Sequence, residues 1–178
     1  MKPIDTEGFK EALGQFASGV TVITVDSAEG LHGMTASAFC SVSLAPPLIL
    51  VCVKTGNTMW TQLESVSGFA VNILAEDQEE LSNRFAGGIV DAEGNWNPWP
   101  ADRSKFEDLD YTIAEKTGAP LLSGTLSALN CMIEQRIDSG DHTIFVGRVV
   151  ASRAVPRGAG RPLVYHAGGY KKVTQGGE

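Results

Sequence analysis

The stretch SALNCMIEQRIDSGDHTIFVGRVVASRAV (127–155) decides the fold class of this chain. It contains two long runs rich in β-branched and apolar residues, interrupted by the turn residues Ser139-Gly140-Asp141. Runs of this kind between turn signals predict strands. We therefore expect residues 127–137 and 142–155 to form two strands, followed by a shorter one over PLVYH (162–166).

Shorter strand-like segments recur upstream. The runs VTVITV (20–25), LILVCV (48–53) and FAVNIL (69–74) predict strands, and we interpret the second as a strand buried on both faces. Between the first two lies LHGMTASAFCSVS (31–43), which consists of small and hydroxyl residues rather than bulky ones. Ala45-Pro46-Pro47 then interrupts the chain, because proline cannot donate to a strand ladder.

The clearest helical pattern lies near the N-terminus. Residues 5–18 place three apolar side chains at i, i+4 and i+7, namely Phe9, Leu13 and Phe16. Asp5 or Thr6 can cap the start of this helix, and Gly19 is expected to end it.

Two shorter helices are expected further along the chain. One covers residues 58–65 with Thr58 as a plausible cap, and the other covers 77–86 with Asp77 at its start. Residues 87–104 carry Gly, Asn, Pro and two Trp without any period, and we interpret them as an extended loop.

The order of these segments favours a mainly β fold. Many strands at short spacing, few helices and no βαβ alternation predict an antiparallel barrel rather than a doubly wound sheet. The 178 residues, 43% hydrophobic and 20% charged, are typical of one ordered domain over residues 1–178, with 173–178 expected to be a disordered tail.

Charge and hydropathy exclude several classes of partner. With 14 Lys plus Arg against 21 Asp plus Glu, the net charge is −7, which disfavours binding to nucleic acid. The longest apolar run, Leu48–Val53, is far below the ~20 residues needed to cross a membrane. The N-terminal segment lacks the apolar stretch of a signal peptide, so we expect a cytoplasmic protein.

Cysteine and histidine give no metal or disulfide signal. Cys40, Cys52 and Cys131 are odd in number and widely spaced, and the last two lie in apolar runs where cysteine commonly acts as a small hydrophobic residue. The three histidines share no ligand spacing, so no metal is expected.

Common nucleotide and hydrolase motifs are missing. The segment VKTGNT (53–58) has the wrong spacing for a phosphate loop, Gly158-Ala159-Gly160 lacks a following helix, and no GxSxG elbow occurs. The segment Thr35-Ala36-Ser37-Ala38, with Ser41 and Ser43, offers another way to hold a ligand, because small side chains let backbone N–H groups approach an anion or a flat ring. The alternative interpretation is an ordinary Ser/Thr-rich edge strand.

Two further features suggest ligand contacts. His142 follows the turn residues Gly140-Asp141 and opens a strong strand, and polar side chains borne on turns of a rigid barrel are well placed to meet a ligand. Tyr165 and Tyr170 flank a glycine-containing turn near the C-terminus, where they could stack on a ring or simply form an aromatic rim.

Taken together, these segments resemble the flavin reductase-like family, the small reductase components of two-component flavin monooxygenases. The resemblance covers most of the chain, and three motifs in the family's order are specific: GMTASAF (33–39), SLAPP (43–47) and GDHTIFVG (140–147). It implies an antiparallel split β-barrel (the FMN-binding split barrel) that acts as a homodimer and binds FMN or FAD. NADH or NADPH would be the co-substrate, and a flavin-dependent monooxygenase would receive the reduced flavin.

The resemblance also implies roles for individual residues. Contacts to the flavin would come from Thr35, Ala36, Ser37, Ser41, Val42, Ser43, Cys52 and Val53. Contacts on the phosphate side would come from Lys54, Asn57 and Thr58. Arg84 would add a cation, Tyr170 would close the cleft, His142 would lie on the nicotinamide side, and Lys105-Phe106 resembles a pair that often follows the LSxxFA helix. Between Ala86 and Lys105 family members usually have a shorter link than this chain.

Hydride transfer between nicotinamide and flavin is chemistry of the cofactors, so a sequence without an obvious acid or base fits a flavin reductase. Two alternatives stay open: a flavin-binding electron-transfer protein on the same barrel, and a related reductase acting on a corrinoid or a metal chelate. For residues 87–104 we expect a rim or lid over the site, or packing of Trp96 and Trp99 on the barrel itself.

Overall fold

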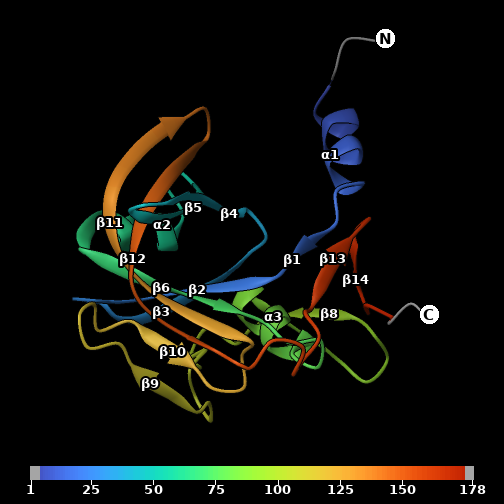
Figure 1. Ribbon diagram of the computed structural model, residues 1–178. Coiled ribbons are helices and arrows are strands. Elements are labelled where there is room, and N and C mark those ends of the chain that lie inside the picture. The colour runs from blue at the N-terminus through green and yellow to red at the C-terminus, as the bar shows by residue number, and fades with distance from the viewer. Residues whose placement is uncertain (1–4, 175–178) are drawn as a thin grey trace.

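The computed structural model describes residues 5–174, so part of the tail expected over 173–178 lies outside the described residues. Seven antiparallel strands form one sheet that curls around a core, in the order β3-β2-β6-β11-β12-β5-β4 (Figure 1). Their bounds are β2 (Thr21–Ser27), β3 (Gly30–Ala36), β4 (Phe39–Leu44), β5 (Pro47–Lys54), β6 (Gly68–Ile73), β11 (Ser127–Ser139) and β12 (His142–Ala154). The mainly β class and the long strand pair at 127–155 are thus confirmed.

The two end strands of this sheet, β3 and β4, are consecutive in the chain but do not pair with each other. Ser37 and Ala38 form the corner between them, and the Cys52 amide donates to the Ala38 carbonyl at 3.1 Å. The barrel therefore stays open along one seam, and the corner residues lie beside β5.

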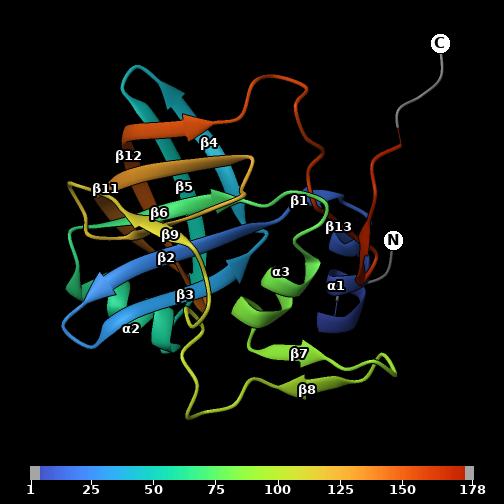
Figure 2. The ribbon, with the colours of Figure 1, turned by 90° about the horizontal axis from the view of Figure 1, so that it is seen from below.

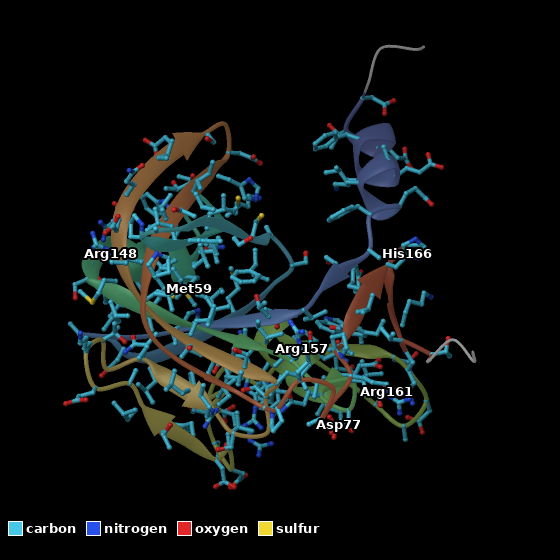
Figure 3. All side chains as sticks on the ribbon, viewed as in Figure 1. Met59, Asp77, Arg148, Arg157, Arg161 and His166 are labelled. Carbon is cyan, nitrogen blue, oxygen red and sulfur yellow. The ribbon has the colours of Figure 1, made fainter. Side chains whose placement is uncertain are left out.

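The barrel core consists of fully buried side chains, among them Ile23, Val51, Phe69 and Phe145. Helix α2 (Thr58–Ser65) contributes buried Met59 and Leu63 to this core. Figure 3 shows Met59 inside the barrel and Arg148 on its outside. The alternation along each strand explains this separation, since successive side chains face opposite sides of a sheet.

Strand β5 corrects one expectation. Its residues alternate, with Ile49, Val51 and Val53 buried and Leu50 and Cys52 only half-buried, so LILVCV is not buried on both faces. A strand in a barrel has one face toward the core and one toward the outside. The outer face of β5 is nevertheless apolar.

The helix boundaries differ from those expected. Helix α1 (Thr6–Gly14) ends well before Gly19, and Asp5 caps it by accepting from the Gly8 amide at 2.8 Å. Residues Ser18–Gly19 instead form strand β1, which pairs with β13. That pairing ends the helix earlier than the apolar pattern suggested.

The other two helices also begin differently. In α2 the cap is Asn57, not Thr58, because its side-chain oxygen accepts from the Trp60 amide at 2.7 Å. Helix α3 (Glu79–Ala86) begins after Gln78, so Asp77 lies outside it. No helix among residues 5–174 is long and apolar enough to span a membrane.

Outside the barrel, α3 and several short strands form a second layer (Figure 2). The prediction of an extended loop over 87–104 was wrong, because β7 and β8 form a hairpin there. The short strands are β7 (Gly88–Val90), β8 (Trp96–Pro98), β9 (Tyr111–Ile113), β10 (Pro120–Leu122), β13 (Val164–His166) and β14 (Gly169–Lys171).

Candidate functional site

The corner between β3 and β4 holds the small, hydroxyl-rich residues that drew attention in the sequence. Ser37 is exposed, whereas Ala36 is buried and its carbonyl accepts from Thr21 Oγ1 at 2.6 Å. Thr35 Oγ1 donates to the Ser82 carbonyl on α3 at 2.6 Å. The Thr35 hydroxyl thus joins the barrel to α3, and Ser37 remains open toward a ligand.

Tyr170 reaches the same place from the C-terminal hairpin β13–β14. Its hydroxyl lies 2.8 Å from Ser82 Oγ and donates to Asn83 Oδ1 at 3.1 Å. Burial raises the pKa of the Tyr170 phenol above its usual range. Ser82 and Asn83 are buried, and the sequence had pointed to neither beyond their place in LSNRFA.

A cavity of about 550 Å³ lies over this cluster. Its lining includes Thr35 and Ser37 from the barrel edge, Tyr170 from the C-terminal hairpin, and Trp96 from the β7–β8 hairpin. The 87–104 segment therefore does form a rim of the cavity that holds part of the expected site. Only the fold could identify Trp96, since nothing in the local pattern distinguishes it from Trp99.

Lys54 and His142 lie on the other side of the corner, at the ends of β5 and β12. They are register partners, so they are neighbours across the two strands. His142 Nδ1 is 2.8 Å from Asp141 Oδ1. The hydrogen bond and the charge of His142, with a smaller contribution from Lys54, hold the pKa of Asp141 below its usual range. This turn therefore places one carboxylate beside two basic side chains at the exposed end of the hairpin.

The outer face of β5 and β12 connects these two parts of the site. Cys52 and Ile144 are half-buried register partners on that face, and burial raises the pKa of the Cys52 thiol. Val53 is fully buried with its side chain in the core, so only its backbone can reach a ligand. Ser41 and Ser43 flank a register shift on β4 that displaces Val42.

Asn57 and Thr58 lie just beyond Lys54. Asn57 serves as the α2 cap, and its side-chain amide also lies 3.7 Å from Met34 Sδ. Thr58 is exposed at the first position of the helix. The fold thus keeps Lys54, Thr58 and His142 accessible in one region.

Arg84 and Lys105 are not brought to the same cavity. The Arg84 guanidinium stacks 4.5 Å above the Trp99 ring and donates to the Glu107 carbonyl, while its Nε has no partner among the described residues. Desolvation, with Arg103 nearby, lowers its pKa. Lys105 Nζ donates to the Phe85 carbonyl at 3.2 Å. Both cations hold the 99–108 segment against α3.

The arrangement suits binding and orientation more than acid–base chemistry. Within residues 5–174 no group of three or more His, Cys, Asp or Glu side chains could hold a metal ion. Hydroxyls, small residues and aromatic rings meet at the corner, with Lys54 and His142 at one end. Such a site can hold a flat ring and a negatively charged group side by side.

Comparison with known proteins identifies the family. The profile described as "Flavin reductase like domain" matches residues 13–174. This chain belongs to the flavin reductase-like family. An NADH-dependent flavin reductase of Rhodococcus sp is 38% identical over 167 residues, covering 92% of this chain and 84% of the relative.

Other members agree in sequence and in fold. The reductase subunit HsaB of a flavin-dependent monooxygenase from Mycobacterium tuberculosis is 34% identical over 170 residues, covering 96% of this chain and 83% of the relative. The structure of Streptomyces globisporus NADH:FAD oxidoreductase SgcE6 has a TM-score of 0.85 at 32% identity and covers 99% of both chains. SgcE6 has also been solved with NAD and FAD fragments. These neighbours confirm the split-barrel interpretation of this flavin reductase-like chain.

Proposed function

We propose that this protein is an NAD(P)H-dependent flavin reductase that delivers reduced flavin to a partner monooxygenase. Family membership supports this proposal, together with a cavity that offers stacking surfaces and hydroxyls and with two basic side chains at the ends of β5 and β12. Relatives named as NADH-dependent reductases and as a monooxygenase reductase subunit favour NADH and an oxygenase partner. NADH is a metabolite of the cytoplasm, where we expect the protein to work.

The residues present fit a flavin. Ser37, Ser41 and Ser43 supply hydroxyls along the corner, and the apolar outer face of Cys52 and Ile144 can cover one side of a ring. A bound flavin would accept a hydride at its N5 from the nicotinamide. The protein contributes orientation and a partly dry surface, which are the main requirements for this transfer.

Lys54 is the cation best placed for a phosphate. It is exposed at the end of β5, and its neighbours Asn57 and Thr58 carry further polar groups. An ammonium group attracts a phosphate as a compact charge. We therefore assign Lys54 to the phosphate of the flavin rather than to the hydride step.

His142 is assigned to the nicotinamide. Its backbone is held by the β11–β12 ladder, and Asp141 engages Nδ1, which leaves Nε2 available. A ring fixed in this way can position a second ligand against a bound flavin without itself taking a proton.

We also propose a homodimer. Several large apolar side chains on the β4 edge and on α1 are exposed, including Val42 (50%), Leu44 (94%) and Leu13 (57%). No residue of α1 is buried, and Figure 1 shows this helix standing apart from the barrel beside β13 and β14. A second copy that covers α1 and the exposed side chains of β4 would remove this surface from water.

The test of the proposed function is a direct assay. Purified protein is mixed with NADH or NADPH and with riboflavin, FMN or FAD, and oxidation is followed at 340 nm. Turnover with a free flavin supports the proposal. Flavin binding without turnover would favour an electron-transfer protein, and reduction of a corrinoid or a metal chelate alone would favour the third class.

A further inference from the structure

A second cavity, of about 710 Å³, lies against the face of α3 that points away from the cavity at the corner. Glu79 and Ser82 line the corner cavity. Glu80, Leu81 and Arg84 line the second one. Residues three and four apart share one face of a helix, so the two cavities meet opposite faces of α3. We call the second cavity the α3 groove, and none of the assignments above uses it.

The α3 groove has apolar side chains from several elements in its lining. Leu81 on α3 and Leu109 are half-buried, and Leu122 on β10 is 1% exposed. Ile89 on β7 is 46% exposed. A cavity of several hundred Å³ with an apolar lining and a few polar groups is typical of a small-molecule site. The groove therefore suits a ligand with an apolar body.

The charged side chains of the α3 groove are mostly acidic. Asp77, Glu80 and Asp110 line it and form no ion pair within residues 5–174. Arg103 also lines it but is already engaged in two ion pairs. Unpaired carboxylates attract a cationic group and repel a simple anion. The ligand is therefore expected to carry a positive charge.

Arg84 adds a demand of the opposite sign. Glu80 lies four residues before it, a spacing that favours an ion pair on a helix, but none forms between them. The guanidinium instead stacks on Trp99, and its buried Nε has no partner among the described residues. Desolvation, with Arg103 nearby, lowers the pKa of Arg84. A carboxylate on a ligand would stabilise this charge.

We propose that the α3 groove binds a zwitterion with an apolar body, which is the chemistry of an α-amino acid with a large apolar side chain. The ammonium group contacts Glu80, the carboxylate contacts Arg84, and the apolar body covers Leu81 and Ile89. The Cβ atoms of residues i and i+4 on a helix are about 5–6 Å apart, close enough for two charges on one carbon atom to contact both. The ligand thus bridges the ion pair that Glu80 and Arg84 leave open.

Asn83 connects the α3 groove to the corner cavity. It lines both cavities and is 6% exposed, and its Oδ1 accepts from the Tyr170 hydroxyl at 3.1 Å. Helix α3 itself lies between the barrel and the β7–β8 hairpin (Figure 2). A ligand held by Glu80 and Arg84 therefore fixes the turn of α3 that carries Asn83. The groove is on this basis an effector site for flavin binding, a role that rests on the proposed function.

Binding to the groove is tested without any flavin. Isothermal titration calorimetry compares L-phenylalanine with two analogues of the same apolar body, 3-phenylpropionate without the ammonium and phenethylamine without the carboxylate. Each analogue lacks one charged contact and should bind about 5- to 30-fold more weakly than phenylalanine. Equal affinity for all three compounds, or no binding of phenylalanine at millimolar concentration, would overturn the proposal.

Matched variants locate the ligand. Glu80→Gln should weaken phenylalanine about 5- to 30-fold, and Glu79→Gln, one residue earlier and outside the groove, should leave it unchanged. Ile89→Ala should weaken it about 2- to 5-fold, whereas Ile113→Ala, on an exposed site of β9 outside the groove, should not. Thermal melts confirm that each variant is folded. An unchanged affinity in Glu80→Gln would contradict the assignment.

The effector role has its own measurement. Saturating phenylalanine should change the dissociation constant for FMN about 2- to 10-fold, and linkage requires FMN to change that for phenylalanine by the same factor. Glu80→Gln should abolish the change at the same phenylalanine concentration. Binding of phenylalanine with no change for FMN would overturn the effector role. Failure of the proposed function is a separate result, namely no NAD(P)H oxidation by the unaltered protein with any flavin, and it leaves the calorimetry with phenylalanine unaffected.

Discussion

The two sides of the barrel next to the candidate site differ in what covers them. On the β3 side, α3 packs so closely that a Cβ on Gly33 would lie 2.4 Å from Phe85 Cε1, and Thr35 is bonded to the Ser82 carbonyl. On the β4 and β5 side nothing packs over the outer face within residues 5–174 in the same way, and Leu44 is almost fully exposed.

This difference indicates what each side does. Polar groups on the covered side are engaged with other protein groups, so they shape the cavity and stabilise the fold. On the open side, Lys54 is exposed and can still bind a ligand. His142 contacts Asp141 through Nδ1, which leaves its Nε2 able to do the same. Substitutions on the covered side should therefore change stability, and those on the open side should change assembly, binding and rate.

The largest effect is expected on the covered side. Phe85 is 1% exposed and packs edge to face with Phe106, so Phe85→Ala should lower the free energy of unfolding by about 3–5 kcal/mol. Ile113→Ala removes an apolar side chain from an exposed site and should change it by less than about 0.5 kcal/mol. Urea denaturation measures the free energy of unfolding of both variants. Equal losses in the two would contradict the view that the side covered by α3 determines stability.

Assembly should respond next. If a second copy covers the open side, Leu44→Asp places a charge in the interface and should weaken dimerisation by about 2–4 kcal/mol, or about 30- to 1000-fold. Sedimentation across a concentration series measures the change. Ile113→Asp, on β9 far from β4 in Figure 1, is the control and should leave the dimer intact. A wild-type protein that is monomeric at micromolar concentration and still binds flavin would contradict the homodimer.

Phosphate binding gives the third effect. Loss of a charged hydrogen bond in Lys54→Ala should weaken FMN by about 1.5–3 kcal/mol, or about 10- to 150-fold, and leave riboflavin nearly unchanged. Titration of both flavins against this variant and against Lys116→Ala, an exposed lysine between β9 and β10, measures the difference. Similar losses for FMN and riboflavin would remove the phosphate assignment.

The smallest effect concerns the hydride step. His142→Ala should lower kcat/KM for NAD(P)H about 5- to 30-fold, because one positioning contact of about 1–2 kcal/mol is lost. Flavin affinity should change by less than about threefold. Steady-state kinetics and a flavin titration on the same sample separate the two quantities. Unfolding, or complete loss of flavin, would instead assign His142 a structural role.

Much of the barrel could be predicted from local patterns. Strands with a strong apolar or β-branched signal, such as 20–25 and 142–155, form where expected. Apolar and β-branched side chains pack favourably in a half-buried sheet whichever strand lies beside them. The short strands β9, β10 and β14 went unrecognised, since three residues carry too little pattern to distinguish a strand from a loop.

The candidate site shows the same division. Its hydroxyl-rich corner and the histidine after the turn were visible in the sequence, because small residues and turn residues have a local chemical signature. Ser82, Asn83 and Trp96 became visible only in the fold, where segments 47 and 88 residues apart meet. Arg84 was expected at the site from the sequence, but the structure places it elsewhere. It contacts Trp99 and the Glu107 carbonyl and does not line the cavity at the corner.

The sequence by itself determined that this chain is a mainly β flavin reductase-like protein with a hydroxyl-rich corner and a turn-borne histidine, because periodicity, turn residues and family motifs are all local properties of the chain. Only the tertiary structure decided that α1 stands apart from the barrel, that a hairpin forms within residues 87–104, and that Trp96 lines the same cavity as Tyr165 and Tyr170. These features depend on close packing between side chains, such as that of Trp96 against Gly88. Such packing depends on the shapes of residues that meet in space, and the order of residues along the chain does not show it.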